Sequence, residues 1–227
     1  MSEESLMDTG IFTIPVAADL VGASASMVRV WVDGHSAKQI PIIKNELGRV
    51  DGKLAISFTN LMELQFVAFF SRAGVRLHEI RAIMSEVKRT LEHPHPFATH
   101  TVFQTDGKRV VADIARKNGI ESLYDLKTKN YEMKLVVMPS LKRDVVYDPD
   151  GNARVWYPRR ALAPNVIINP HHSFGRTILK DSRIPTATIA RAYDVEKSIG
   201  VVSAMFEIPE RRVREAVSFE AAFRSAA

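Results

Sequence analysis

Residues 13–34 read TIPVAADLVGASASMVRVWVDG, and this stretch decides the fold of the first part of the chain. Pro15 suits the first turn of a helix, where its missing N–H would have no partner in any case. Gly22 can supply a tight turn, and Ser24 can cap a second helix from Ala25 to Val32. The pattern therefore predicts two short helices joined by a turn, an arrangement that either reads DNA or only builds a core.

A β-ribbon is predicted directly after this helix pair. IPII (40–43) and KLAIS (53–57) are typical of strands, and NELGRVDG (45–52) between them is typical of a turn. Helix, turn, helix and ribbon follow one another in this order in a winged helix-turn-helix. We expect DNA to contact the outer side of the second helix and the cations of the ribbon. The candidate DNA-binding residues are Ser24, Ser26, Met27, Arg29, Lys44, Arg49 and Lys53.

The next helix is predicted to be buried on more than one side. Eight of the ten residues from Leu61 to Phe70 are apolar, so the helix has no continuous polar face. One side can cover the winged unit, and the other requires a second domain or a second subunit. The candidate interface residues are Leu61, Met62, Phe66, Phe69 and Phe70. A further amphipathic helix follows, and Pro94 and Pro96 end the helical region.

The rest of the chain is predicted to form a β module and then three helices. Asp106-Gly107 is a hairpin signal between TVFQT and KRVVADI, YEMKLVVM alternates as a strand does, and DPDG (148–151) joins two further strands. Helices are expected to begin at Pro185, Ser198 and Pro209, and they can form a second helix-turn-helix unit. The expected class is α+β, with units at 1–96, 97–164 and 165–227.

Composition restricts the chemistry that this chain can perform. The 227 residues carry a formal charge of +5, but residues 1–91 contain ten cations and ten anions, so the helix pair would bind DNA through a few placed cations. The absence of cysteine excludes disulfides and zinc–thiolate sites. The acidic N-terminus is unlike a signal peptide, and no apolar run reaches the length of a membrane span. We expect a cytoplasmic protein.

No catalytic, cofactor-binding or metal-binding pattern is present in the sequence. Neither Gly-x-Ser-x-Gly nor a phosphate-binding Gly-x-x-x-x-Gly-Lys occurs. The seven histidines are too scattered to converge on a metal ion. Asp144, Asp148 and Asp150 surround a predicted turn, where acidic side chains are common. We therefore expect a binding protein without a cofactor rather than an enzyme.

Two parts of the chain resemble known families. Residues 12–84, with IPVAADLVGASASMVRVWV and ISFTNLMELQFVAFFSRAGVRLHEIRAIM, resemble the DNA-binding domain of MerR-type regulators. Residues 166–220 resemble a small domain, formerly of unknown function, that occurs in bacterial antitoxins; its hallmark corresponds here to Asp181-Ser182-Arg183-Ile184-Pro185. The chain departs from these families in three ways. Pro94 and Pro96 interrupt the chain where MerR-type regulators carry a long dimerising helix, and the effector cysteines of those regulators are absent. In the antitoxin hallmark, Asp181-Ser182 replaces Gly-Thr.

Together, the two parts are similar to VapB-type antitoxins. The resemblance implies that the protein neutralises a VapC-type toxin, a ribonuclease of the PIN-domain class, and binds operator DNA of its own operon, as a homodimer. Arginines placed at the carboxylate cluster of such a nuclease would block access of RNA. The candidate toxin-binding residues are Arg183, Arg211, Arg212, Arg214 and Arg224. The alternative is a MerR-like regulator without a toxin partner, in which residues 97–164 bind a small apolar molecule.

Overall fold

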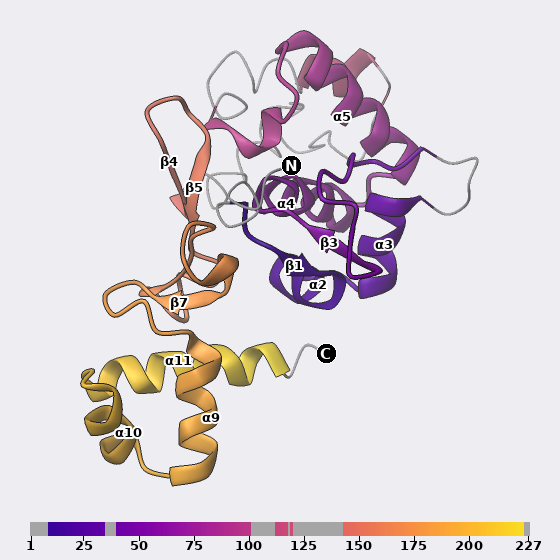
Figure 1. Cartoon of the computed structure of the whole chain (residues 1–227). Helices are drawn as coiled ribbons and strands as arrows, with labels where there is room; N and C mark the ends of the chain where they lie inside the picture. Colours follow the sequence, from indigo (N-terminus) through magenta and orange to yellow (C-terminus); the bar gives the residue numbers. More distant parts are fainter. Residues whose placement is uncertain (1–8, 35–39, 101–111, 118, 120–142, 225–227) are drawn as a thin grey trace.

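The computed structural model describes residues 9–34, 40–100, 112–117, 119 and 143–224. Helices and two small antiparallel sheets make up the described chain, which confirms the α+β class. A helical unit formed by the first hundred residues lies at one end of the molecule (Figure 1). Three helices near the C-terminus lie at the other end, and the second sheet lies between the two helical units.

The predicted helix pair is confirmed. Helices α2 (Ile14–Val21) and α3 (Ala25–Asp33) are joined by a turn in which Gly22 has a φ of 67°. A side chain with a Cβ is strained at that angle, so glycine fits this turn best. The Oγ of Ser24 accepts a hydrogen bond from the Met27 N–H at 3.2 Å and caps α3, as the sequence predicts.

The ribbon forms, but with different strands from those expected. Strands β1 (Phe12–Thr13), β3 (Lys53–Ile56) and β2 (Arg49–Val50) make an antiparallel sheet in the order β1-β3-β2. The prediction of a strand at residues 40–43 is wrong. The N–H groups of Ile42 and Ile43 both donate to the Trp31 carbonyl, at 2.9 and 3.0 Å, and both side chains are buried. Burial against the end of α3 therefore replaces strand pairing in this segment.

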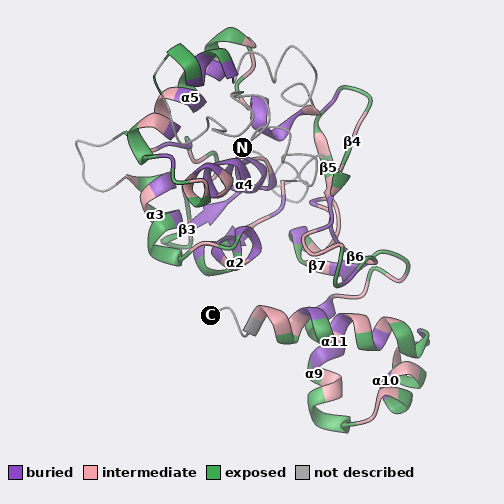
Figure 2. Ribbon diagram, turned by 180° about the vertical axis from the view of Figure 1, so that it is seen from behind, coloured by how far each residue is buried: buried purple, intermediate pink, exposed green. Residues whose placement is uncertain are grey.

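Helix α4 (Phe58–Arg72) is the central element of the first unit. It contacts α2, α3, α5 (Leu77–Thr90) and the short 3-10 helix η1 (Pro96–Ala98), and Figure 2 shows it as largely buried. Of the five candidate interface residues, all but Phe69 are buried, and Phe69 is partly buried. These contacts lie within one chain, which accounts for the apolar character of α4 without a second subunit.

The centre of the chain is only partly described. The predicted hairpin at Asp106-Gly107 and the alternating segment 131–138 lie outside the described residues. The strand predicted to run through residues 108–114 is wrong in its last three positions, because residues 112–117 are helical. Ala112 and Ala115 are three residues apart and both are buried, which is the spacing of a helix packed on the core.

The second sheet has the strand order β4-β5-β6-β7 and is antiparallel throughout. Its strands are β4 (Val145–Tyr147), β5 (Ala153–Trp156), β6 (Val166–Ile168) and β7 (Thr177–Leu179). The hairpin predicted at DPDG joins β4 to β5. Strands on both sides of residue 164, where one expected unit ends and the next begins, therefore belong to one sheet, in which Trp156 pairs with Ile168.

The three predicted C-terminal helices are confirmed as α9 (Thr186–Glu196), α10 (Ile199–Phe206) and α11 (Glu210–Arg224). They enclose a second hydrophobic core, separate from the first. The residues of this core are Ala163, Val166, Leu179, Ile189, Val202, Ile208, Val213, Ala216 and Phe219. The sheet contributes to both cores, because Trp156 and Ile168 face the first core whereas Val166 and Leu179 face the second.

A close backbone contact joins the first unit to the loop between β6 and β7. The Ile11 N–H donates to the Phe174 carbonyl at 3.0 Å. Gly175 has a φ of 79°, and a Cβ at this position would lie 2.8 Å from the Phe12 ring. Only glycine avoids both the strain and the clash.

Among the described residues, no single helix is long and apolar enough to cross a membrane. Helices α2 and α3 meet the required length and composition only when they are taken together, and the pair is bent by 109°.

Candidate nucleic-acid interface

The outer face of α3 carries the four candidate residues of the helix pair. Val28, Trp31 and Val32 anchor the helix in the core and thereby fix which side faces outward. Ser24, Ser26, Met27 and Arg29 are all exposed on that outward side. Serine, arginine and methionine side chains can contact base edges, thymine methyl groups or phosphates, so the face has suitable chemistry for DNA.

The ribbon lies beside the C-terminal end of α3. Arg49 Nη2 is 3.6 Å from the Asp33 carboxylate, and Arg49 Nη1 donates to the Gly52 carbonyl at 3.2 Å. Asp51 and Gly52 form the tip of the ribbon with φ values of 48° and 75°, as in the two-residue turns of tight hairpins. Lys53 next to the tip is exposed, and so is Lys44. The structure thus brings Arg49 of the ribbon to the C-terminal end of α3.

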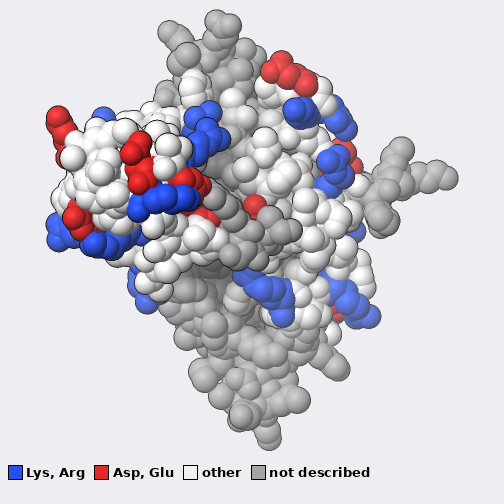
Figure 3. Space-filling view, turned by 90° about the horizontal axis from the view of Figure 1, so that it is seen from below, with Lys and Arg blue, Asp and Glu red and all other residues white. Residues whose placement is uncertain are grey.

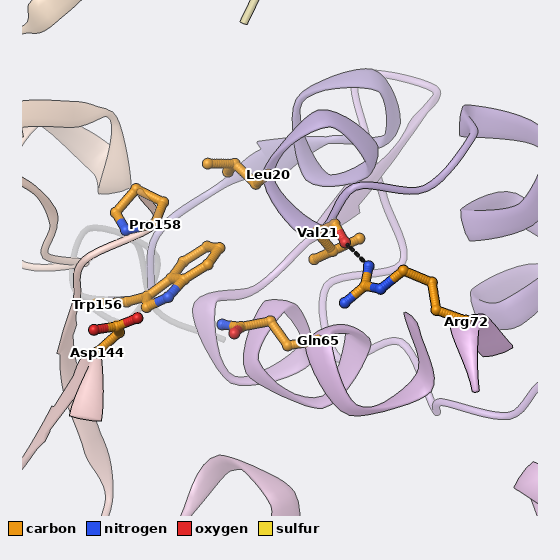
Figure 4. A pocket seen from close by; sticks show the side chains of 7 residues that line it. All are labelled: Leu20, Val21, Gln65, Arg72, Asp144, Trp156 and Pro158. Atoms are coloured by element: carbon orange, nitrogen blue, oxygen red, sulfur yellow. Dashed lines mark hydrogen bonds between the residues drawn. The ribbon is translucent and has the colours of Figure 1, made fainter. Parts of the chain in front are cut away.

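Arg72 and Arg76 lie on the other flank of α3, at the turn between α4 and α5, and sequence reasoning missed both. Arg72 Nη1 donates to the Val21 carbonyl at 2.8 Å, which ties the end of α4 to the helix pair (Figure 4). Arg76 is exposed at the start of α5 and pairs with Glu79 at 2.8 Å. Both arginines lie far beyond the end of α3 at Asp33 in the sequence, so no local pattern reveals them.

A pocket of about 600 Å³ adjoins the turn of the helix pair. Ser24, Met27 and Trp31 line one part of it, and Arg72 and Arg159 line another. The guanidinium of Arg159 also lies 5.1 Å from the ring centroid of Phe223 in α11. At this separation a cation is attracted to an aromatic face. Arg159 therefore connects the C-terminal helix to the border of the candidate DNA-binding face.

A smaller pocket of about 170 Å³ lies at the joint between the first unit and the second sheet. Gln65 reaches into it from α4, and Asp144 and Trp156 lie opposite on the sheet side (Figure 4). Leu20 and Pro158 line it as well. The pocket is too small for most organic ligands, whose sites usually exceed about 300 Å³. Its position indicates that the pocket results from the way in which the first unit and the second sheet pack together.

A polar cluster around the buried Glu63 holds the ribbon loop against α4 and α5. His95 Nε2 lies 3.1 Å from the Glu46 carboxylate, and Nδ1 lies 3.4 Å from the carboxylate of Glu63. Lys88 Nζ approaches Glu63 at 3.1 Å, and the Ser57 hydroxyl donates to Glu46. Hydrogen bonds to Glu46 and then Glu63 raise the pKa of His95 to about 9, and the bond to His95 lowers the pKa of Glu46. The imidazole is therefore protonated at neutral pH.

The five candidate toxin-binding arginines have different environments. Arg211 and Arg183 are exposed, and Arg214 is exposed while pairing with Glu210 at 2.7 Å. The side chain of Arg212 is only 14% exposed, because its Nε donates to Asp181 at 3.0 Å and its Nη1 to Glu215 at 3.2 Å. Arg212 thus holds α11 to the hallmark loop. The side chain of Arg224 lies outside the described residues.

Charges of both signs are mixed on the face of the three-helix unit that is seen from below (Figure 3). Basic and acidic side chains alternate there, and no continuous basic surface covers this face of the described chain. Within the described residues, no group of three or more histidine, aspartate or glutamate side chains could hold a metal ion.

Comparisons with known proteins give a likeness of fold. No family model matches the sequence, and no curated protein matches it. Among solved structures, the chain is similar to the X-ray crystal structure of Rv2018 from Mycobacterium tuberculosis, with a TM-score of 0.71 at 17% sequence identity. The alignment covers 91% of this chain and 96% of that one. At this level of identity, the likeness concerns the fold across nearly the whole chain.

Proposed function

We propose that the protein is the antitoxin of a toxin–antitoxin pair, with one unit that binds operator DNA and another that binds a PIN-domain ribonuclease of the VapC type. The observation that carries the proposal is the presence of two separate hydrophobic cores. One core is built largely from the segment that resembles a MerR-type DNA-binding domain, and the other largely from the segment that resembles the antitoxin domain. Two units would allow the chain to bind two partners at the same time. The single chain would then link neutralisation of the toxin to repression of its own operon.

The DNA-binding part of the proposal rests on the exposed face of α3 and the cations around it. Arg29 is the cation of α3, Arg76 lines the groove beside this helix, and Lys53 is exposed next to the tip of the ribbon. In this arrangement Arg29 would contact a base edge or a phosphate, and the flanking cations would contact phosphates on either side. Since the cations are few, we expect modest affinity that falls as salt is raised.

The toxin-binding part of the proposal assigns Arg211 and Arg214 on α11, together with Arg183, to the nuclease. Exposed arginines can pair with the carboxylates that hold the metal of a PIN-domain site, and the three-helix unit would then cover the cleft. Arg212 has a different role in this proposal, because its guanidinium is occupied by Asp181 and Glu215. It would position α11 rather than contact the partner.

The test is co-expression of the full chain with the product of the adjacent gene, followed by size-exclusion chromatography and a ribonuclease assay. We expect one complex with suppressed nuclease activity. Arg211→Glu together with Arg214→Glu should weaken the complex, more strongly at low salt. Arg191→Glu, an exposed arginine on α9, is the matched control. A nuclease that remains fully active in the presence of the wild-type chain would refute the proposal.

A second candidate function is a MerR-like regulator that senses a small molecule without a toxin partner. Residues 97–164, where that ligand was expected to bind, are described only at 97–100, 112–117, 119 and 143–164. The observation that favours this alternative lies elsewhere, in the pockets beside α3. Purification of the chain with a bound apolar metabolite, and without an associated protein, would favour the sensor over the antitoxin.

A further inference from the structure

An apolar groove of about 580 Å³ runs between α3 and the turn that joins α4 to α5. Its main lining residues are Met27, Val30, Trp31, Ser71, Val75 and Leu77. Two of these, Met27 and Leu77, are large apolar side chains with exposed fractions of 40% and 39%. The volume lies within the range of about 300–1,000 Å³ that is usual for small-molecule sites. The groove also adjoins the pocket at the helix-pair turn, since Met27, Trp31 and Ser71 line both.

Trp31, which lines the groove, carries a polar group without a partner. Its side chain is 1% exposed, and within the described chain the indole N–H makes no hydrogen bond. An unpaired buried donor of this kind destabilises the folded chain. Core packing does not require an indole N–H, whereas an acceptor that entered beside the exposed Met27 side chain could satisfy it. Arg76 provides a cation at the edge of the same groove.

We propose that this groove binds a small molecule with an apolar body and one anionic hydrogen-bond acceptor. The apolar body would lie against Met27, Val30 and Leu77. The acceptor would take the Trp31 N–H and lie near Arg76, an arrangement of many apolar contacts and few polar ones that is typical of ligand sites. The proposal does not rest on the antitoxin role; it gives the second candidate function, the small-molecule sensor, a specific binding site, and binding of the ligand requires neither DNA nor a toxin.

A small molecule suits the groove better than a nucleic-acid strand does. Phosphates are bound by cations, hydroxyls and backbone N–H groups, and apolar side chains dominate this lining. A protein partner would bury a much larger surface, about 800 Å² on each side for a stable complex. The groove beside α3 is confined to the short space between one helix and one turn.

The experiment uses the full chain and the probe 8-anilinonaphthalene-1-sulfonate, which combines an aromatic body with an anionic acceptor. Fluorescence titration and calorimetry should give saturable binding of one probe per chain. Leu77→Glu should weaken the affinity about tenfold or more, because it places a like charge against the sulfonate and removes apolar contact. Leu77 is exposed at the first position of α5, where an acidic residue favours the helix, so the variant should remain folded.

Leu162→Glu is the matched control, since Leu162 is an exposed leucine outside the groove and the variant should bind the probe as the wild type does. Trp31→Phe should weaken binding while the thermal midpoint shows a folded chain, which tests the indole N–H separately. Absence of saturable binding, or equal affinity in Leu77→Glu and the wild type, overturns the proposal. A concentration-dependent dimer that Leu77→Glu abolishes would show that a second copy occupies the groove, which also overturns it.

Discussion

His95 illustrates how one side chain can help to position a loop that is distant in sequence. It follows α5 in the chain, yet it contacts Glu46 in the loop that precedes β2 and Glu63 within α4. Glu63 is completely buried, and a buried carboxylate is stable only when cations or hydrogen bonds compensate it. His95 and Lys88 provide that compensation, so the ribbon loop is held by charges that lie far away in sequence.

The stability of the first unit should fall at alkaline pH in a manner that depends on His95. Its pKa is about 9 in the folded chain and about 6.5 when unfolded. The raised pKa means that the stabilisation is complete below pH 6.5 and is lost as the pH rises through 9. His95→Gln should reduce the free energy of unfolding by about 1–3 kcal/mol near pH 6, and the difference should vanish near pH 10.

Urea unfolding at pH 6, 8 and 10 would measure the effect of His95→Gln, with His78→Gln as the control. His78 is exposed on α5, and its replacement should leave the pH dependence unchanged. A constant difference between the wild type and His95→Gln across this pH range would show that the ion pairs do not contribute to stability.

Helix α4 shows how a mostly apolar helix can be covered by other segments of its own chain. Phe66 packs on Phe97 with ring centroids 4.8 Å apart, and Phe70 contacts the same ring from another position. The 3-10 helix η1 therefore covers the side of α4 that would otherwise require a partner. The sequence predicts that α4 is buried, but it does not reveal which segment buries it.

Phe66→Ala should destabilise the chain by about 3–5 kcal/mol, because it removes a buried ring and leaves a cavity. Phe69→Ala should have a clearly smaller effect, since Phe69 is only partly buried. Phe66→Glu should be insoluble or unfolded, as a buried unpaired charge is costly. Chemical denaturation would compare the two alanine variants, and equal losses would contradict the internal packing of Phe66.

Helix α3 and its flanking cations predict a pattern of DNA-binding defects. Arg29→Ala should weaken binding of the upstream promoter fragment by about 1–3 kcal/mol if Arg29 contacts a base. Lys53→Ala and Arg76→Ala should weaken binding to all sequences about equally and reduce the salt dependence. Arg89→Ala, an exposed arginine near the end of α5, is the control.

Gel retardation at several salt concentrations would measure these effects. If the wild type does not retard the promoter fragment at low salt, alone or with its partner, the DNA-binding proposal is wrong. An effect of Arg89→Ala as large as that of Arg76→Ala would show that binding depends on overall charge rather than on the face around α3.

For the molecule as a whole, the second sheet determines where the chain can be divided. Strand β6 pairs with β5 across residue 164, and Ala163 belongs to the second core. A fragment that begins at residue 165 therefore lacks Ala163 and exposes an unpaired edge of β6, which promotes aggregation. A fragment that begins at residue 143 retains all four strands.

Fragment 143–227 should be soluble and should unfold cooperatively, whereas fragment 165–227 should be less stable and should aggregate more readily. Circular dichroism with thermal unfolding would compare them. In a pull-down of the toxin, we expect capture by fragment 143–227 and none by fragment 1–96. Capture by fragment 1–96 alone would reverse the assignment of the two units, and equal stability of both C-terminal fragments would show that the sheet is dispensable.

The sequence by itself determined the local elements whose signals are contained in short segments. The caps at Ser24 and Gly22, the hairpin at DPDG and the helix start near Pro185 depend on residues a few positions apart, and all of them form. The exposed residues of α3 could be identified for the same reason, because helical spacing places them opposite Val28 and Trp31.

Only the tertiary structure decided the features that depend on residues distant in sequence. Ile42 and Ile43 have strand-like side chains, but the carbonyl of Trp31 offers their N–H groups another partner, and burial favours it. Arg72 and Arg76 reach the flank of α3 because α4 and α5 fold back over the helix pair. Arg212 is apparent as a structural residue only once Asp181 and Glu215 lie beside it. Contacts of this kind depend on how the elements pack together, which no local pattern of residues specifies.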